Sequence, residues 1–437
     1  MHPKSTHRLQ FHPSPPLSGS VAIPGDKSIT HRAVIFGSMA GGTTTVHGYL
    51  PSGDCQSTIG AFRRLGVESS TRSGTLTIRS AGWHAFVGPD QVLDCGNSGT
   101  TARLLMGLLA GLPFRSSLTG DESLRRRPMR RVAEPLQRMG AEIRMNKGDN
   151  LPAVVDGRPL KGIDYTSPVA SAQIKTCLLL AGITARGTTS VTEPALSRDH
   201  TERMLPAFGV RVKQDGLKVS VDGGQTLTPA EITVPGDISS AAFLIVAATL
   251  VPGSDITLTG VGVNPTRTGV LQVLTRMGAH ITRDNERLAG GEPVADLRIR
   301  HAALKGIEIE PEMVPATIDE FPILFAAAAM ASGTTRVRGA EELRVKESDR
   351  IAAMARELAR VGVTVEEFPD GLAVHGPAAI KGAVCEAYGD HRLAMSMAIL
   401  GLVADAPITV DASAIGTSFP DFSTLLATLG ARVEQVD

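Results

Sequence analysis

The sequence predicts an α/β protein of two domains, each containing three repeated α/β units. Three observations support this fold class: six glycine-marked helix endings, strand-like segments rich in β-branched residues, and a Pro-Gly-Asp motif that occurs twice. The chain has 437 residues and is 42% apolar, enough for two or three cores at roughly 100–200 residues per domain. The units differ too much from one another for a solenoid array.

A glycine follows the expected second helix of every unit and precedes a further strand. Glycine readily adopts the left-handed conformation that ends many helices, so each is predicted to be a helix C-terminal cap. Six copies of one ending predict six units. In chain order they are Leu65-Gly66-Val67, Met139-Gly140-Ala141, Phe208-Gly209-Val210, Met277-Gly278-Ala279, Val361-Gly362-Val363 and Leu429-Gly430-Ala431.

Segments of alternating β-branched residues precede several of these second helices. A period of two residues predicts strands at Thr188–Val191, Thr334–Val337 and Pro407–Val410. Each unit is therefore expected to hold a first helix, a strand, a second helix and a further strand.

The Pro-Gly-Asp motif divides the chain. It occurs first at Pro24-Gly25-Asp26 and again at Pro235-Gly236-Asp237, each time before an apolar run and a Thr-rich strand. We predict a first three-unit domain over residues 27–234, and a second formed by residues 1–26 together with 235–437. The hinge is expected near residues 24–27 and 234–237, and a short strand before Pro24 is expected to join the second domain.

Polar residues gather where helices are expected to begin. Ser28 or Thr30 is predicted to cap the first helix, and helix N-termini favour anions. The first-helix clusters are Lys27-Ser28 with Arg32, Asn97-Ser98-Gly99-Thr100 with Arg103, Ser171-Ala172-Gln173 with Lys175, Asp237-Ile238-Ser239-Ser240, Asp319-Glu320, and Asp390-His391-Arg392. The second helices are preceded by Arg127, Arg198, Arg267 and Lys346-Glu347-Ser348-Asp349-Arg350.

Two interpretations of these clusters compete. One is a phosphate or carboxylate site, and the other is ordinary capped helices with surface cations. We assign the surface interpretation to Arg267, and also to Arg125, Arg126, Arg130 and Arg131 on a helix expected to begin at Pro128. If Asp319 and Glu347 are considered in isolation, helix capping is the simpler role for each. If they share a cleft with Lys27 and the arginines, each becomes a candidate for proton transfer.

Composition excludes several classes of protein. Lys plus Arg equals Asp plus Glu at 44 each, which disfavours general nucleic-acid or membrane-surface binding. The four cysteines have no metal-ligand spacing, and Cys177 and Cys385 lie among apolar residues, so we expect buried thiols in a reducing cytoplasm. Residues 1–17 are polar and Pro-rich, without the apolar segment of a signal peptide, and no P-loop is present.

Taken together, the motifs resemble those of the EPSP synthase (5-enolpyruvylshikimate-3-phosphate synthase) family, over essentially the full length. The resemblance implies two domains of three βαβαββ-type units each, an inside-out α/β barrel arrangement, with the active site in the interdomain cleft. The matching motifs are Pro24-Gly25-Asp26-Lys27-Ser28 with Arg32, Gly96-Asn97-Ser98-Gly99-Thr100, Arg127-Pro128, Ser171-Ala172-Gln173, Asp319-Glu320, Arg344 to Arg350, Asp390-His391-Arg392 and Phe419-Pro420.

The resemblance implies transfer of the enolpyruvyl group of phosphoenolpyruvate to the 5-hydroxyl of shikimate 3-phosphate, releasing phosphate, with no metal and no cofactor. It also implies a cytoplasmic enzyme of chorismate and aromatic amino acid biosynthesis, which we expect to be monomeric. The implied ligands of shikimate 3-phosphate are Lys27, Ser28, Arg32, Ser171, Ala172, Gln173, Arg198, Asp319 and Lys346. Those of phosphoenolpyruvate are Lys27, Gly99, Arg127, Gln173, Arg350 and Arg392.

The implied catalytic residues are Asp319, Glu347 and Lys27. Asp319 is expected to take the hydroxyl proton, and either Glu347 or Lys27 to protonate the methylene carbon. His391 is expected to be structural. Many relatives carry a Lys just before Thr-Phe-Pro, whereas this chain has Gly416-Thr417-Ser418-Phe419-Pro420. Gly99 retains the small residue that the family associates with sensitivity to glyphosate, so we expect glyphosate inhibition.

Two alternatives stay open. The related UDP-N-acetylglucosamine enolpyruvyl transferases share the repeats, but they usually have Lys-Asn at the position of Lys27-Ser28 and a Cys in the loop corresponding to residues 120–128. A non-catalytic anion-binding protein on the same scaffold would not need Asp319, Glu347 and the arginines together.

Overall fold

The computed structural model describes residues 7–436 and divides into two compact units. Unit 1 holds the described residues up to Pro24, Pro235–Leu288 and those from Pro293 onward, and unit 2 holds Gly25–Val234 and Ala289–Glu292. The predicted domain boundary lies two residues further along the chain. Gly25 belongs to unit 2 because its backbone packs so closely on Gly48 that a Cβ would lie 2.0 Å from the Gly48 carbonyl oxygen. Residues 1–6 and 437, included in the predicted second domain, lie outside the described residues.

Unit 2 contains three four-stranded sheets, with the strand orders β14-β3-β5-β4, β6-β7-β9-β8 and β10-β11-β13-β12. The first pair of strands in each order is parallel and the other pairs are antiparallel. Its elements are α1 (Lys27–Met39), β3 (Gly41–His47), α2 (Gly53–Arg64), β4 (Glu68–Arg72), β5 (Thr75–Ala81), η1 (Trp83–Ala85), β6 (Leu93–Asp94), α3 (Gly99–Ala110), β7 (Arg115–Thr119), α4 (Glu122–Arg126), α5 (Arg130–Arg138), β8 (Glu142–Asn146), β9 (Asn150–Asp156), β10 (Asp164–Thr166), α6 (Ala172–Thr184), β11 (Thr188–Thr192), α7 (His200–Met204), η2 (Leu205–Phe208), β12 (Val212–Asp215), β13 (Lys218–Asp222) and β14 (Glu231–Thr233).

Unit 1 repeats this plan, with the strand orders β16-β17-β15-β2, β18-β19-β21-β20 and β22-β23-β1-β24. Its elements are β1 (Arg8–Phe11), β2 (Ser18–Ala22), α8 (Ile238–Leu250), β15 (Asp255–Gly262), α9 (Gly269–Met277), β16 (His280–Ala289), β17 (Glu292–Arg300), β18 (Glu308–Ile309), η3 (Pro311–Met313), α10 (Val314–Thr317), α11 (Phe321–Ala329), β19 (Gly333–Val337), η4 (Glu341–Val345), α12 (Arg350–Arg360), β20 (Thr364–Phe368), β21 (Gly371–Gly376), β22 (Ala383–Cys385), α13 (His391–Gly401), β23 (Ile408–Asp411), η5 (Ile415–Thr417), α14 (Phe422–Thr428) and β24 (Val433–Val436). The residues that join β16 to β17 pack with unit 2.

Strands near the N-terminus and at the end of the unit 2 segment pair with strands from distant parts of the sequence. β1 lies between β23 and β24, and β2 lies parallel to β15, so the N-terminal strands belong to sheets of unit 1. In the same way, β14 at the end of the unit 2 segment lies parallel to β3 at its beginning. Six sheets of one plan, three in each unit, confirm the predicted fold class.

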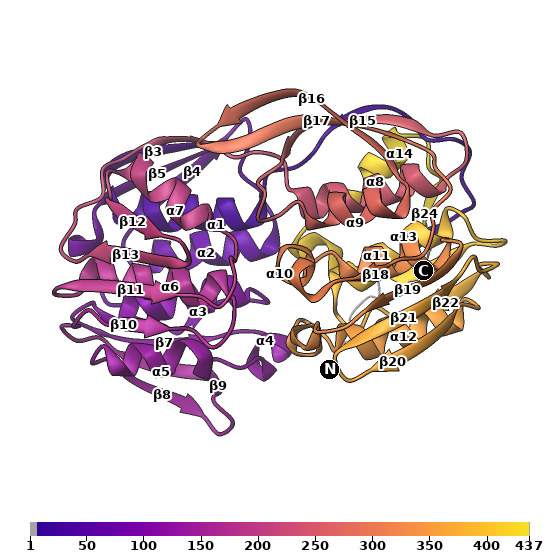
Figure 1. Cartoon of the computed structure of the whole chain (residues 1–437). Coiled ribbons are helices and arrows are strands. Elements are labelled where there is room, and N and C mark those ends of the chain that lie inside the picture. The colour runs from indigo at the N-terminus through magenta and orange to yellow at the C-terminus, as the bar shows by residue number, and fades with distance from the viewer. Residues whose placement is uncertain (1–6, 437) are drawn as a thin grey trace. The chain divides into compact units, whose positions relative to one another are not determined.

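The first helices of the repeats form the centre of each unit, and the sheets lie outside them (Figure 1). In unit 1, α8, α11 and α13 contact one another, and in unit 2, α3 contacts both α1 and α6. Every residue of α8 is buried. A helix that is apolar on all sides is stable in water only when it is covered on all sides, which explains this arrangement.

The six predicted glycine caps are confirmed. Each glycine has a positive φ angle, the conformation in which a side chain would be strained. The values are +92° at Gly66, +108° at Gly140, +79° at Gly209, +104° at Gly278, +91° at Gly362 and +105° at Gly430.

Two predicted helix starts are wrong. Asp26 caps α1 by accepting a hydrogen bond from the Ile29 N–H at 2.9 Å, while the Thr30 hydroxyl accepts from the Leu50 N–H instead. Ser28 cannot cap because it already lies in the first turn. The helix expected to begin at Pro128 begins at Arg130. Of the four arginines assigned to surfaces there, Arg131 is half-buried, and the other three are exposed as expected.

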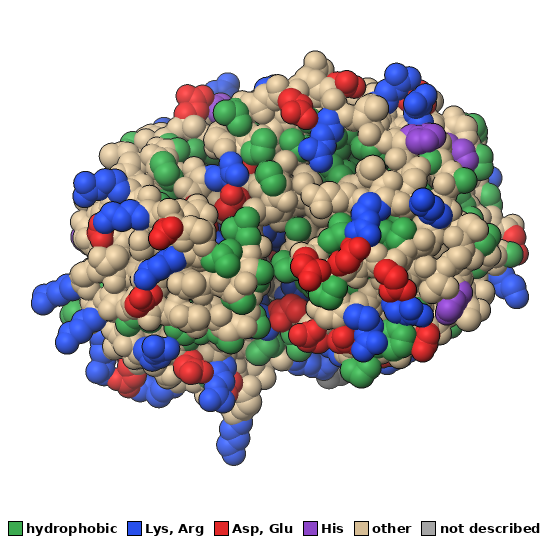
Figure 2. Space-filling view, viewed as in Figure 1, with side chains coloured by type: hydrophobic (Ala, Val, Ile, Leu, Met, Phe, Trp, Pro, Cys, Tyr) green, Lys and Arg blue, Asp and Glu red, His purple; other side chains and the backbone are tan. Residues whose placement is uncertain are grey.

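The surface and the cysteines agree with the composition. Lys and Arg side chains are interspersed with Asp and Glu over the face shown in Figure 2. All four cysteines are buried, as predicted for Cys177 and Cys385, and burial raises the pKa of the Cys55, Cys95 and Cys385 thiols to about 12. Within residues 7–436, no helix is long and apolar enough to cross a membrane.

Candidate active site

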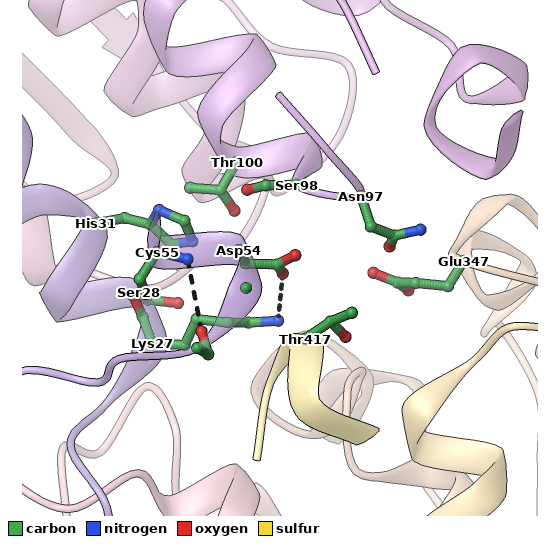
Figure 3. Close-up of polar contacts among 12 residues, drawn as sticks. Lys27, Ser28, His31, Asp54, Cys55, Asn97, Ser98, Thr100, Glu347 and Thr417 are labelled. Carbon is green, nitrogen blue, oxygen red and sulfur yellow. Dashed lines mark hydrogen bonds and ion pairs between the residues drawn. The ribbon is translucent and has the colours of Figure 1, made fainter. Parts of the chain in front are cut away.

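In unit 2, Lys27 lies at the first position of α1. Its ammonium contacts the Asp54 carboxylate at 2.9 Å, and Figure 3 shows the two side chains directed toward each other. Asp54 lies in the first turn of α2, where a carboxylate is favoured by the helix dipole. Asp54 is not among the site residues predicted from the sequence, although an acidic residue after Ser52-Gly53 is a recognisable helix-start signal. Lys27 is thereby held at the meeting point of two helix N-termini.

Arg32 is buried one turn further along α1 and connects the first and third repeats of unit 2. Its Nε donates to the Thr201 Oγ1 and its Nη2 to the Thr176 Oγ1, both at 2.8 Å. Its Nη1 donates to the Ser28 carbonyl oxygen at 3.0 Å, and the Arg198 Nη1 lies 3.5 Å from the Ser28 hydroxyl. The structure therefore brings three predicted site residues, Ser28, Arg32 and Arg198, into one group.

A second group in unit 2 surrounds the N-terminus of α3. Arg127 donates to the Asn97 Oδ1 at 2.7 Å, and Gln173 donates to the Thr100 Oγ1 at 3.2 Å. Arg103 donates to the Gln173 Oε1 at 2.7 Å and so belongs to this group, although it is not among the predicted substrate ligands. Two guanidinium groups, an amide and a helix N-terminus together suit an anion with several oxygen atoms.

Gly99 lies between the two guanidinium groups of this cluster. A Cβ there would lie 2.8 Å from the Arg103 Nη1 and 3.4 Å from the Arg127 Nη1. Its φ angle is not in the left-handed region, so the requirement for glycine is one of space alone.

A buried ion group lies behind the predicted Ser171-Ala172-Gln173 segment. The Lys175 ammonium contacts the Glu193 and Glu202 carboxylates, each at 2.7 Å. Glu193 also accepts the Ser171 N–H at 2.8 Å, and Ser171 caps α6. The turn that carries Ser171 is therefore fixed from both sides.

A chain of hydroxyl groups links α1, α2 and α3. The His31 Nδ1 lies 2.7 Å from the Thr58 Oγ1, which lies 2.6 Å from the Thr101 Oγ1, and Thr101 donates to the Ser98 hydroxyl at 2.8 Å. Burial lowers the pKa of His31 from 6.5 to about 3, with the Lys27 and Arg32 charges acting in the same direction. The imidazole is therefore neutral at physiological pH.

This pKa shift predicts a pH-dependent stability for unit 2. Because the unfolded state binds the proton more tightly, the free energy of unfolding decreases as the pH falls below the unfolded pKa of 6.5 towards about 3. From pH 7 to pH 5 the loss from His31 is about 2 kcal/mol. Trp83 is the single tryptophan of the sequence and lies in unit 2, so its fluorescence in urea titrations reports this unfolding. The variant His31→Gln should lack this part of the pH dependence, and equal slopes for both proteins would contradict the assignment.

In unit 1, Asp319 lies beside two cations. Its Oδ1 is 3.6 Å from the Lys346 Nζ and 3.6 Å from the Arg350 Nη1. Arg350 is 1% exposed, donating to the Asp390 Oδ2 at 2.8 Å and to the Glu347 Oε2 at 2.7 Å. Burial opposes the charge on Arg350, but the Asp390 and Glu347 carboxylates outweigh it and raise the pKa of the guanidinium.

Arg392 extends this group. Its Nη1 donates to the Asp319 carbonyl oxygen at 2.7 Å, and its N–H is accepted by Asp390, which caps α13. Neither Asp319 nor Glu347 caps a helix, since α11 has no side-chain cap and α12 is capped by Asp349. The capping alternative for both acids is therefore wrong.

The surface assignment of Arg267 is also wrong. Its side chain is 3% exposed, and it donates to the Ser239 hydroxyl at 2.7 Å. It also lies 3.3 Å from the Asp237 carboxylate. A buried guanidinium needs such partners, and they come from a helix start far away in the sequence.

His391 and the Thr417 segment are the remaining features considered in the sequence. His391 is buried at the start of α13, and Thr417 ends η5. In the part of the chain that the structure describes, no group of three or more His, Cys, Asp or Glu residues is placed to hold a metal ion. Each unit thus contributes a group of cations and polar side chains at helix starts.

A solved structure with little sequence identity shares the fold of this chain. The enolpyruvyl transferase NikO from Streptomyces tendae superposes with a TM-score of 0.80 over 99% of both chains at 18% identity. At that identity the likeness shows the fold alone. The chain thus has the fold of the two-domain enolpyruvyl transferases.

Sequence comparisons then give the family. The family model described as EPSP synthase (3-phosphoshikimate 1-carboxyvinyltransferase) matches residues 11–426. A 3-phosphoshikimate 1-carboxyvinyltransferase from Geobacter sulfurreducens is 53% identical over 97% of this chain and 99% of its own, and one from Halorhodospira halophila is 54% identical over 97% and 96%. EPSP synthase from Acinetobacter baumannii is 46% identical, with a TM-score of 0.87 over 99% of this chain and 100% of its own. The chain belongs to the EPSP synthase family.

Proposed function

We propose that this chain is a 3-phosphoshikimate 1-carboxyvinyltransferase of the shikimate pathway. It transfers the enolpyruvyl group of phosphoenolpyruvate to the 5-hydroxyl of shikimate 3-phosphate and releases phosphate. Family membership supports this activity, as do the names of relatives that match nearly the whole chain. One observation of the structure also supports this activity. The Asp319 carboxylate lies next to Lys346 and Arg350 and does not cap a helix, so it is suited to act as a general base.

The substrates explain why so many cations are required. Both substrates are polyanions, and fixed cations hold them together without reorganising during the reaction. Shikimate 3-phosphate is assigned to Lys27, Ser28, Arg32, Ser171, Ala172, Gln173, Arg198, Asp319 and Lys346. Phosphoenolpyruvate is assigned to Lys27, Gly99, Arg127, Gln173, Arg350 and Arg392.

The reaction then proceeds by addition and elimination. Asp319 accepts the proton of the 5-hydroxyl while that oxygen bonds to C2 of phosphoenolpyruvate, and C3 gains a proton from Glu347 or Lys27. Collapse of the tetrahedral intermediate breaks the bond from C2 to the phosphate oxygen. Loss of a proton from C3 restores the double bond and completes the product.

An assay of phosphate release tests this function. We expect phosphate to form from phosphoenolpyruvate only when shikimate 3-phosphate is present, with no metal or organic cofactor added. Release with UDP-N-acetylglucosamine as the acceptor would support the related transferase. Binding of both substrates without release would indicate a non-catalytic protein.

The lack of space around Gly99 can be tested with a pair of glycine-to-alanine variants. In Gly99→Ala the new methyl group displaces the Arg103 guanidinium and occupies the space beside that of Arg127, an overpacking cost of about 1–3 kcal/mol. We expect the KM for phosphoenolpyruvate to rise about tenfold or more, and glyphosate, which inhibits the wild type, to inhibit the variant less. Gly60→Ala is the control, because no atom outside α2 lies within 4 Å of a Cβ there. Undiminished wild-type turnover at millimolar glyphosate with limiting phosphoenolpyruvate would contradict the expected sensitivity.

We further infer a cytoplasmic monomer. Four buried, unpaired thiols suit a reducing compartment. Sedimentation at several protein concentrations tests the monomer, since a mass that increases with concentration would contradict it.

A further inference from the structure

Arg267 is held in a defined turn immediately before α9. Its N–H donates to the Asn264 carbonyl oxygen at 2.8 Å, and the Asn264 side chain accepts the Thr266 N–H at 2.9 Å. The guanidinium points inward, where it is 3% exposed. The activity proposed above gives no role to this buried cation.

A continuous path of buried polar groups leads away from Arg267. Its Nη2 donates to the Ser239 hydroxyl at 2.7 Å, and that hydroxyl donates to the Glu320 Oε1. Glu320 is 1% exposed and adjoins Asp319 in the sequence. The path therefore ends beside the proposed general base.

The same Glu320 oxygen faces a second cation. The Arg392 Nη1 lies 3.5 Å from the Glu320 Oε1, whereas it donates to the Asp319 carbonyl oxygen at 2.7 Å. Arg392 thus makes its shorter bond to a neutral carbonyl and a longer ion pair to the carboxylate. The carboxylate accepts from the Ser239 hydroxyl, which in turn accepts from Arg267. Arg267 also pairs with Asp237 at 3.3 Å, so its charge serves both acids, Asp237 directly and Glu320 through Ser239.

A close backbone approach reinforces this link. Gly269, two residues after Arg267, lies so near α10 that a Cβ would be 2.1 Å from the Thr317 Oγ1 and 2.8 Å from the Ala316 carbonyl oxygen. α10 leads directly into Asp319. The turn that carries Arg267 and the segment that carries Asp319 are therefore packed as one body.

We propose that Arg267 is a positioning residue that keeps the Arg392 guanidinium available to the anionic substrate. This inference rests on the proposed function, in which Arg392 binds phosphoenolpyruvate. Without Arg267, the Ser239 hydroxyl loses the cation that polarises it and Asp237 loses its counter-charge, so the negative charge around Glu320 is less compensated. A buried charge is then strongly drawn to the nearest opposite charge. Arg392 then shortens its 3.5 Å ion pair with Glu320 and is no longer available to bind the substrate.

Steady-state kinetics of Arg267→Met test the proposal. We expect the KM for phosphoenolpyruvate to rise at least tenfold, while the KM for shikimate 3-phosphate stays within about twofold of wild type. Arg276→Met is the matched control, because Arg276 is an exposed arginine on α9 paired with Glu310. A KM for phosphoenolpyruvate equal to that of this control would overturn the proposal.

A double variant separates positioning from simple loss of packing. In Arg267→Met/Glu320→Gln the competing carboxylate charge is absent, so we expect the KM for phosphoenolpyruvate to return at least halfway to wild type. If Glu320→Gln instead worsens the defect, Arg267 acts only through stability and the proposal fails.

If Arg267→Met does not fold, Ser239→Ala provides an alternative test of the proposal. It interrupts the path without removing a charge, and it should raise the KM for phosphoenolpyruvate by a smaller factor, about two- to fivefold. An unchanged KM in folded Ser239→Ala would contradict the path. Absence of phosphate release by the wild type would instead contradict the proposed function, so the two failures are distinguishable.

Discussion

Asp319→Asn is expected to lower kcat by about 10²–10⁴-fold, the range of general acid–base catalysis. Asparagine keeps the shape of the side chain but cannot accept the hydroxyl proton. The Asp319 carboxylate lies 3.6 Å from both the Lys346 Nζ and the Arg350 Nη1, which hold it in position to accept the hydroxyl proton. Because the residue acts in the transition state, kcat should fall much more than either KM changes.

The measurement is phosphate release at saturating concentrations of both substrates. Asp370→Asn is a suitable control, because Asp370 is an acidic residue of the same unit in a partly exposed ion pair with Arg338. That variant should retain wild-type kcat. Near-normal kcat in Asp319→Asn would remove Asp319 from the mechanism.

Arg350→Met is expected to destabilise unit 1 by about 3–5 kcal/mol, the cost of leaving buried carboxylates without their cation. The guanidinium is 1% exposed, and Asp390, with which it pairs at 2.8 Å, is 0% exposed. Arg350→Lys should recover little of the loss, because a single ammonium cannot donate in the fork geometry to both Asp390 and Glu347. Loss of turnover should accompany the loss of stability.

Calorimetric unfolding and hydrogen exchange of the α12 and α13 amides measure this effect. Arg336→Met removes an arginine from an exposed pair with Glu308, which is worth at most about 1 kcal/mol. If Arg350→Met unfolds at the same temperature as this control, the buried ion group does not stabilise unit 1.

The repeat architecture could be predicted because its signals are local. A glycine such as Gly209 or Gly278 marks a helix end by its own conformational freedom, and its positive φ angle does not depend on distant residues. Alternation of β-branched residues likewise marks β11, β19 and β23 within a few positions. The sequence by itself therefore determined the class of fold, the number of repeats and, through its motifs, the family.

The partners of the charged residues were decided only by the tertiary structure. Arg267 resembles a surface arginine in sequence, and it is buried because Asp237 and Ser239, from a helix start elsewhere in the chain, supply its counter-charge and acceptor. Asp319 and Glu347 look like helix caps, but Asp349 caps α12 and the two acids contact Arg350 instead. A buried charge is tolerated only where packing brings opposite charges within a few ångströms. Such pairing joins residues far apart in sequence, so no local pattern reveals it.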